Sequence, residues 1–188
     1  MGNLIFGRFI GLTNDAGTSH GNKAVIEVKI NDYTSAELEE SERNKADISE
    51  KLRRIFEAVV CREKHPRTKI VLSFEVLSSS KSLMPHLINL ASYSLLEAGV
   101  SVVDTISCVT CGLINNAFVV DLEVEEVDDC DFSMILANLK FSQEVSYFKT
   151  FGALDLNNEK LSEVRITFSC DFMQIVLNFV IFWIFLTL

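Results

Sequence analysis

The sequence is poor in positive charge, in histidine and in the signatures of common catalytic sites. Its 188 residues include 17 Lys and Arg against 26 Asp and Glu, which gives a formal net charge of −9. So acidic a chain is not expected to bind nucleic acid by itself through a broad basic surface. The three histidines are scattered, and no Ser/His/Asp grouping, Walker phosphate loop or dinucleotide fingerprint is present. The sequence therefore offers no site of the common hydrolase or nucleotide-binding kinds.

A secretory signal is also missing. Residues 1–9 form a short apolar patch interrupted by Arg8, with no cleavage region after it, and the five cysteines are odd in number. We therefore expect a reduced intracellular setting. Cys108 and Cys111 form a single CxxC, but residues three apart on a strand point to opposite faces. The pattern favours buried strand cysteines over a zinc site or a disulfide.

Hydrophobic periodicity predicts alternating strands and helices in the middle of the chain. Every second residue of 70–76 is apolar, which is typical of a half-buried strand. The residues that follow have apolar side chains at helical spacing, which predicts a helix. Gly99 is placed to end this helix, and a strand is expected to start at Val100. The apolar face of this helix consists of Leu83, Leu87, Leu90, Ala91 and Leu95.

The remaining segments predict further strands and helices around this central stretch. A helix is expected from Asp47, with Asp47 or Ser49 as its cap. The charged residues 33–47 are expected to be either a solvated linker or the start of that helix, and we favour these interpretations over a metal site. Such a mixture in 188 residues predicts a single α/β domain with a mixed sheet. The expected strands are 4–12, 24–30, 101–113, 117–124, 133–139 and 144–148, with a turn at 115–116 and a final helix at 157–168.

Four segments, in order and nearly without gaps, resemble the RNase PH family. They are EAVV (57–60), HPRT (65–68), SLMPHLIN (82–89) and LLEAGV (95–100). Among the members of that family, the chain most resembles the catalytically silent RNase PH-like subunits of the eukaryotic RNA exosome ring, and a weaker resemblance extends from about residue 22 to about residue 165. The resemblance implies an α/β fold with one RNase PH-like domain over residues 1–170, a mixed sheet and packed helices, without the amino-terminal hairpin with which members usually begin.

The resemblance also implies that the catalytic activity of the family has been lost in this chain. Active relatives are phosphorolytic and carry an Asp-Gly-Gly-Thr-Arg-like loop, in which backbone N–H groups approach phosphate. The corresponding residues here lack both glycines, the hydroxyl and the arginine. We therefore expect no enzyme activity, no metal and no cofactor. These residues are Ser80, Lys81, Ser82, Leu83 and Met84.

Three further positions correspond to family elements that bind a metal ion or phosphate. Asp121 matches the first of two family aspartates, Val127 stands at the second, and Asp128 lies beside it. A family arginine corresponds to Arg54 or its neighbour Arg53. A residual phosphate-dependent 3′-to-5′ exoribonuclease would use Asp121, Asp128 and Arg54. The alternative, which we favour, is that Asp121 is a carboxylate at the end of a strand and that Asp128 lies in an acidic surface loop. Arg54 would then lie on the solvent-exposed face of a helix.

The expected role is that of a non-catalytic structural subunit of the exosome ring in 3′-to-5′ RNA processing and degradation. Its partners would be the other RNase PH-like ring subunits and the cap subunits, with RNA passing through the assembled ring, in the nucleus, including the nucleolus, and in the cytoplasm. The candidate RNA contacts are Arg62, Lys64, Arg67 and Lys81, for which ordinary surface charge is the alternative interpretation.

The carboxyl-terminal segment 171–188 departs from the family. After Asp171 the chain continues for 17 residues without a charge, FMQIVLNFVIFWIFLTL. A membrane span needs about twenty apolar residues, so the segment is borderline. A tail anchor, which would make the chain a membrane-anchored scaffold, is one interpretation. A buried helix, an interface element and an aberrant or alternative carboxyl terminus are the others.

Overall fold

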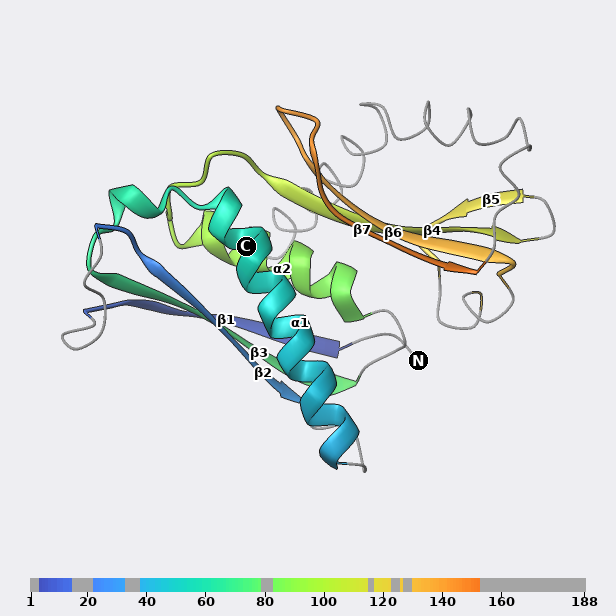
Figure 1. The fold of residues 1–188 in the computed structure, drawn as a ribbon, viewed down its shortest axis with the longest axis horizontal. Helices are drawn as coiled ribbons and strands as arrows, with labels where there is room; N and C mark the ends of the chain where they lie inside the picture. The colour runs from blue at the N-terminus through green and yellow to red at the C-terminus, as the bar shows by residue number, and fades with distance from the viewer. Residues whose placement is uncertain are drawn as a thin grey trace, which may run out of the picture. The chain divides into compact units, whose positions relative to one another are not determined.

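The computed structural model describes residues 4–14, 22–32, 38–78, 83–114, 117–122, 126 and 130–152. Their contacts group the chain into two compact units, residues 1–108 with 136–147 and residues 109–135 with 148–188. The elements, shown in Figure 1, are β1 (Leu4–Asn14), β2 (Val25–Asp32), α1 (Leu38–Val59), the 3₁₀ turn η1 (Arg62–Lys64), β3 (Thr68–Ser78), α2 (Leu83–Glu97), β4 (Ile106–Ile114), β5 (Ala117–Val120), β6 (Phe132–Leu139) and β7 (Val145–Gly152).

The first unit contains a mixed three-stranded sheet in the order β1-β3-β2. The central strand β3 pairs antiparallel with β1 and parallel with β2. Parallel neighbours cannot be joined by a tight turn, and α1 supplies the crossover between β2 and β3. The predicted strands at 4–12, 24–30 and 70–76 are therefore confirmed, and so is the mixed sheet. The strands after α2 form a second sheet, a division that the sequence did not indicate.

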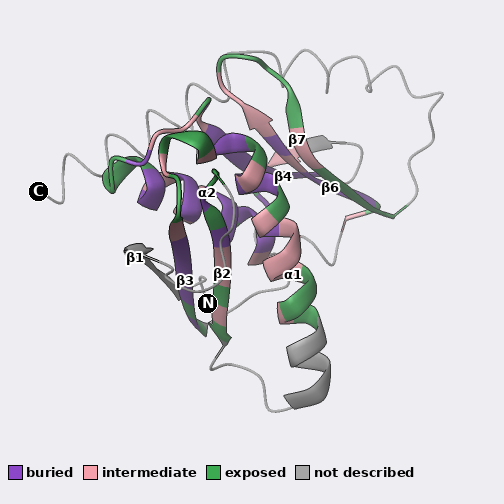
Figure 2. Ribbon diagram, turned by 60° about the vertical axis from the view of Figure 1, so that its left-hand side comes forward, coloured by how far each residue is buried: buried purple, intermediate pink, exposed green. Residues whose placement is uncertain are grey.

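One face of β3 forms the centre of the core. The side chains of Ile70, Leu72, Phe74 and Val76 are at most 1% exposed. The parallel register places Ile26 beside Ile70, so the apolar face continues onto β2. Helix α1 packs beside β2 and α2 beside β1, and both helices bury apolar side chains. Figure 2 shows β3 and α2 largely buried, whereas α1 also presents an exposed side.

Helix α1 begins at Leu38, well before the predicted start at Asp47. Neither Asp47 nor Ser49 is therefore its cap, and residues 38–47 of the charged stretch belong to the helix rather than to a linker. Glu, Lys and Arg are good helix formers, and oppositely charged side chains four apart support one another along the helix surface. Asp47 itself pairs with Lys51.

Helix α2 ends as predicted, but the next strand begins later than expected. Gly99 has a φ of 67°, and the Val100 N–H donates to the carbonyl oxygen of Leu95 at 3.0 Å. This left-handed residue closes the helix at little cost because glycine has no Cβ. The prediction that Val100 begins a strand is wrong, since β4 starts at Ile106. In between, Val102 forms only an isolated bridge with Val60.

The second sheet has the order β5-β4-β6-β7. Strands β4 and β5 pair antiparallel, with Ile114 opposite Ala117. In the second unit Val109, Cys111, Phe132 and Met134 form a small apolar core. Cys108 and Cys111 are both buried on β4 and neither forms a disulfide, which confirms the prediction of buried strand cysteines.

Several predictions fall on residues that the structure does not describe. These are the turn at 115–116, the final helix at 157–168 and the segment 171–188. Among the helices that the structure does describe, none has the length and hydrophobicity that a membrane crossing requires.

Candidate nucleic-acid interface

The predicted RNA contacts lie mainly in the connection between α1 and β3. Within it the Lys64 N–H donates to the Cys61 carbonyl at 3.0 Å, and the His65 N–H donates to the Arg62 carbonyl at 3.3 Å. The Thr68 hydroxyl donates to the His65 carbonyl at 2.7 Å. These local bonds hold residues 61–68 in a compact loop, which we call the basic loop.

Arg62 faces inward from the basic loop. Its Nε donates to the carbonyl oxygen of Ala24 at 2.8 Å, and the Ala24 N–H donates to the Arg62 carbonyl at 2.9 Å. Its Nη1 lies 3.5 Å from a carboxylate oxygen of Glu57, and the side chain is 27% exposed. Arg62 therefore joins the loop to the start of β2 and the end of α1.

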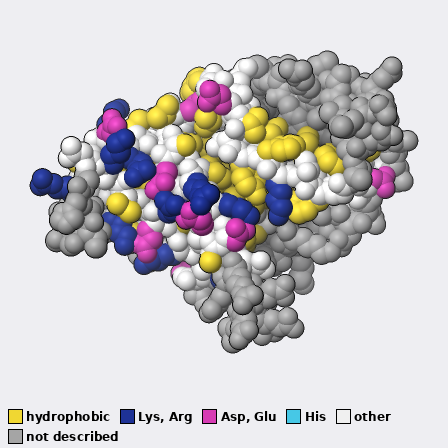
Figure 3. All heavy atoms as spheres, viewed as in Figure 1, with side chains coloured by type: hydrophobic (Ala, Val, Ile, Leu, Met, Phe, Trp, Pro, Cys, Tyr) yellow, Lys and Arg dark blue, Asp and Glu magenta, His cyan; other side chains and the backbone are white. Residues whose placement is uncertain are grey.

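Lys64 and Arg67 are exposed on the same loop. In the part of the chain that the structure describes, neither forms an ion pair, whereas the neighbouring Glu63 is paired with Lys23 at 3.0 Å. Arg67 has a φ of 57°, in the left-handed region. The fourth candidate, Lys81, lies outside the described residues. Figure 3 shows that basic and acidic side chains are interspersed on the face it presents.

The positions that correspond to the family's metal and phosphate sites belong to different units of the structure. Arg54 lies on α1 in the first unit with a side chain 73% exposed, and its Nε is bonded to Glu50 at 2.7 Å. Asp121 follows β5 in the second unit, is exposed, and has a φ of 62°. Asp128 lies outside the described residues. Arg54 thus lies on the solvent-exposed face of a helix and Asp121 at the end of a strand.

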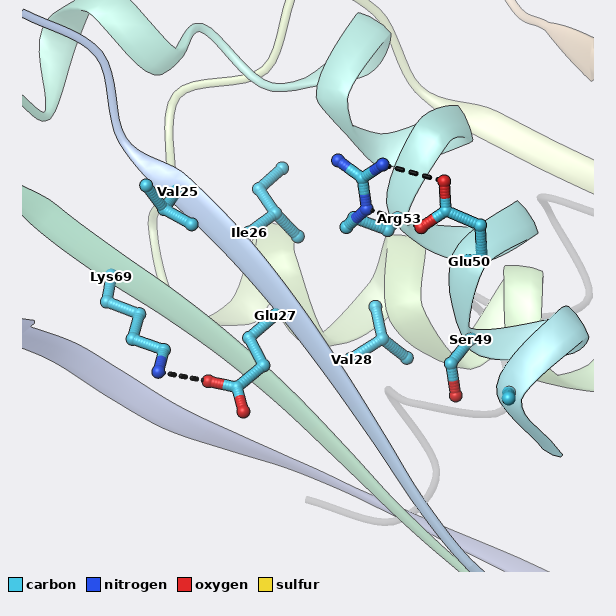
Figure 4. A pocket seen from close by; sticks show the side chains of 9 residues that line it. Val25, Ile26, Glu27, Val28, Ser49, Glu50, Arg53 and Lys69 are labelled. Atoms are coloured by element: carbon cyan, nitrogen blue, oxygen red, sulfur yellow. Dashed lines mark hydrogen bonds and ion pairs between the residues drawn. The ribbon is translucent and has the colours of Figure 1, made fainter. Parts of the chain in front are cut away.

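A shallow pocket of about 340 Å³ lies between β2 and α1, and Figure 4 shows its walls. Its apolar lining is Val25, Ile26, Val28 and Ala46, and its polar lining is Ser49, Glu50, Arg53, Glu27 and Lys69. Sequence reasoning did not identify this pocket, because it depends on how α1 lies along the edge of the sheet. The only available signal was the apolar alternation of residues 24–30.

The charges in the pocket are neutralised within the protein. Arg53 donates twice to Glu50, both at 2.7 Å, and its Nη1 lies 2.7 Å from Glu57. Hydrogen bonds from Arg53 and then Arg54 lower the pKa of Glu50 to about 2. On the sheet, the hydrogen bond from Lys69 lowers the pKa of Glu27. The pocket thus offers apolar surface without an uncompensated cation for a phosphate.

The described residues include no group of three or more His, Cys, Asp or Glu side chains placed to hold a metal ion.

Comparison with protein families identifies the lineage. The model of the 3′ exoribonuclease family, domain 1, matches residues 12–101, and the model of domain 2 of the same family matches residues 104–165. The chain belongs to the RNase PH family. The resemblance inferred from EAVV, HPRT, SLMPHLIN and LLEAGV is therefore confirmed for the family.

Relatives of this RNase PH family chain share moderate identity over part of their length. Exosome complex component SKI6 of Saccharomyces cerevisiae is 32% identical over 106 residues, which are 53% of this chain and 43% of that protein. Exosome complex component Rrp41 of Pyrobaculum islandicum is 35% identical over 80 residues, 43% of this chain and 32% of that protein. The chain thus spans less than half the length of the curated relatives it matches.

A solved structure supports the fold. The crystal structure of rice (Oryza sativa) Rrp46 aligns with a TM-score of 0.72 at 17% identity, covering 94% of this chain and 84% of that one. The prediction of an RNase PH-like α/β fold with packed helices is confirmed.

Proposed function

We propose that this chain is a non-catalytic structural component of an exosome ring built from RNase PH-like subunits, and that it supports 3′-to-5′ RNA processing and degradation. The observation that carries the proposal is the combination of an RNase PH-like fold with an apolar helix start where active relatives bind phosphate. The relatives named exosome complex components favour this assembly over others.

The helix start provides few phosphate ligands. Leu83 and Met84 open α2, and Met84 is buried at 7% exposure. Pro85 follows in the same turn and has no N–H to donate. Anion binding at a helix start relies on free backbone N–H groups, and on glycines that let an anion come close. A buried thioether and a proline at these positions disfavour phosphate binding.

The second candidate function is residual phosphorolysis that uses Asp121, Asp128 and Arg54. The exposed carboxylate of Asp121 favours it only weakly, since Arg54 is already bonded to Glu50. We therefore expect that Asp121 contributes nothing to RNA turnover.

Assembly is tested by affinity purification of the tagged chain from its own cells at high salt, followed by mass spectrometry. The expected result is recovery of the other ring subunits and the cap subunits. Recovery of none of them, with the chain aggregated or in the membrane pellet, would overturn the proposal and favour an anchor formed by residues 172–188. In intact cells we expect the tagged chain in the nucleus, including the nucleolus, and in the cytoplasm.

Catalytic silence is tested on the recovered complex with a labelled RNA and inorganic phosphate. The complex carrying Asp121→Asn should release nucleoside diphosphates at the same rate as the unmodified complex, because any such activity belongs to another subunit. Arg54→Gln serves as the second variant. A loss of tenfold or more with either substitution, in a complex of unchanged composition, would establish a catalytic role for this chain.

A further inference from the structure

We propose that Lys64 and Arg67 are the pair through which this chain contacts the phosphates of single-stranded RNA, and that Arg62 is a positioning residue which holds their loop in place. The inference rests on the proposed function, which brings RNA to the assembled ring. It divides the three candidate RNA contacts of the basic loop into two that would face the ligand and one that would not.

The distribution of ion pairs distinguishes Lys64 and Arg67 from most other cations. In the described part of the chain most cations already have a charged partner: Lys23 pairs with Glu63, Arg62 with Glu57, and Lys69 with Glu27. Lys140 and Lys149 each lie over a phenylalanine ring. Lys45, Lys64 and Arg67 make no ion pair there, and of these Lys64 and Arg67 share one short loop. An anion that approaches the loop meets two cations without displacing a carboxylate.

The guanidinium of Arg62 is held against the protein. Its guanidinium bonds the carbonyl of Ala24 at 2.8 Å, and the Ala24 N–H returns a bond to the Arg62 carbonyl at 2.9 Å. Turning the side chain toward RNA would break the bond to Ala24 and the pair with Glu57. Leaving the carbonyl unbonded and separating a partly buried ion pair both oppose that movement.

The backbone of the basic loop is constrained. Pro66 has a fixed φ, and the bond from the Thr68 hydroxyl to the His65 carbonyl closes the turn before β3. The two cations therefore project from a preorganised backbone, so less freedom is lost when they bind. Point-charge contacts to phosphate carry no base information, so we expect binding that is independent of sequence.

The test measures the affinity of the purified complex for a labelled, unstructured 20-nucleotide RNA between 50 and 300 mM KCl. For single strands each phosphate contact contributes about 0.7 to the slope of log K against log salt. The Lys64→Gln, Arg67→Gln double variant should lower that slope by about 1.4. Lys45→Gln is the matched control: it removes an unpaired cation roughly 20 Å away along α1, given 1.5 Å per residue, and should leave the slope unchanged.

Arg62→Gln separates positioning from contact. If Arg62 only positions the loop, the slope stays that of the parent, while the Ala24 amide exchanges hydrogen faster because its link to the loop is weakened. A fall of about 0.7 in the slope would instead make Arg62 a phosphate contact and overturn that part of the inference.

Failure of the inference differs from failure of the proposed function. A complex of normal composition whose slope is the same with and without Lys64 and Arg67 would overturn the inference alone. If no partners are recovered, the proposed function fails, and the same variants are compared in the isolated chain at 50 mM KCl. An unchanged affinity there would overturn the inference as well, and a weaker affinity of the double variant would support it.

Discussion

At the scale of single residues, the carboxylate of Asp104 organises the turn between β6 and β7 in the first unit. It is 5% exposed and accepts hydrogen bonds from the N–H groups of Thr105 at 2.6 Å and Ser142 at 2.9 Å. The Phe141 N–H approaches both of its oxygens, at 3.0 and 3.2 Å. Three backbone donors that would otherwise need water are thus satisfied by one side chain.

The first prediction is that Asp104→Asn lowers the free energy of unfolding by about 1–3 kcal/mol. The substitution makes the charge-assisted hydrogen bonds neutral, and it replaces one carboxylate oxygen by an NH₂ donor that faces backbone N–H groups. Urea unfolding measures the change. Glu144→Gln, an exposed substitution at the same turn, is the control and should change stability by less than about 0.5 kcal/mol. Equal stability of the Asp104→Asn chain and its parent would show that the carboxylate does not hold the turn.

The second prediction concerns the pH dependence of this residue. Burial opposes ionisation of Asp104, but the N–H groups of Ser142, Thr105 and Phe141 more than compensate, so its pKa lies below the ordinary value. The unfolded chain therefore binds the proton first, at about pH 3.9. The stability that Asp104 contributes is present above that pH and is lost as the pH falls through the folded-state pKa. Unfolding midpoints at pH 7, 5, 4 and 3 should fall less steeply with Asp104→Asn than in the parent.

A third prediction concerns the close packing around Gly112 on β4 in the second unit. A Cβ there would lie 2.7 Å from the Cys130 Sγ, 2.8 Å from the Leu122 Cδ1 and 2.9 Å from the carbonyl oxygen of Phe132. Gly112→Ala should therefore destabilise the chain by about 1–3 kcal/mol through overpacking. The contrasting case is Gly99, which has a φ of 67° and open space around it, so that Gly99→Asn should be tolerated better than Gly112→Ala in thermal unfolding.

At the scale of elements, a single amide joins α2 to β4. The Asn89 Oδ1 accepts from the Cys108 N–H at 2.7 Å, and its Nδ2 donates to the Cys108 carbonyl at 2.8 Å. An asparagine can make both bonds at once because its side chain carries one acceptor and one donor group. Helix and strand are therefore fixed in register where β4 begins.

The fourth prediction follows from this pairing. Asn89→Leu keeps a similar volume and removes both bonds, so amide hydrogen exchange at Cys108 should accelerate and stability should fall by about 1–3 kcal/mol. Asn89→Asp retains the acceptor and should protect the Cys108 amide better than Asn89→Leu does. Unchanged exchange in the leucine variant would mean that sheet pairing alone protects this residue.

At the scale of the whole molecule, charge decides what the chain can do alone. Its net charge of −9 repels a polyanion, and most cations on the described surface are already paired with carboxylates. We predict that the isolated chain binds a 20-nucleotide RNA more weakly than about 100 µM at 150 mM KCl, because long-range repulsion outweighs two local contacts. Fluorescence anisotropy measures this, and binding in the low micromolar range would show that the chain needs no neighbours for RNA contact.

Local patterns in the sequence were sufficient to predict most of the elements. Alternation at Ile70, Leu72, Phe74 and Val76 and the helical spacing in 83–95 are periodicities that each segment expresses by itself, and Gly99 marks a helix end through its own backbone freedom. The predicted starts of α1 and β4 were wrong because the start of each element depends on several weak preferences that add up. The start of α1 at Leu38 depends on many charged residues, and the late start of β4 depends on strand pairing.

The sequence by itself determined the lineage, the alternating strand and helix pattern and the absence of the phosphate-loop glycines, because these depend on residue identity and short-range order. Only the tertiary structure decided which cations are available. Arg62, Lys64 and Arg67 look equivalent along the chain, yet Arg62 bonds Ala24 and Glu57 while the other two remain exposed. Ala24 is 38 residues away from Arg62 in sequence. Only folding brings its carbonyl to the guanidinium, and no local pattern encodes that contact.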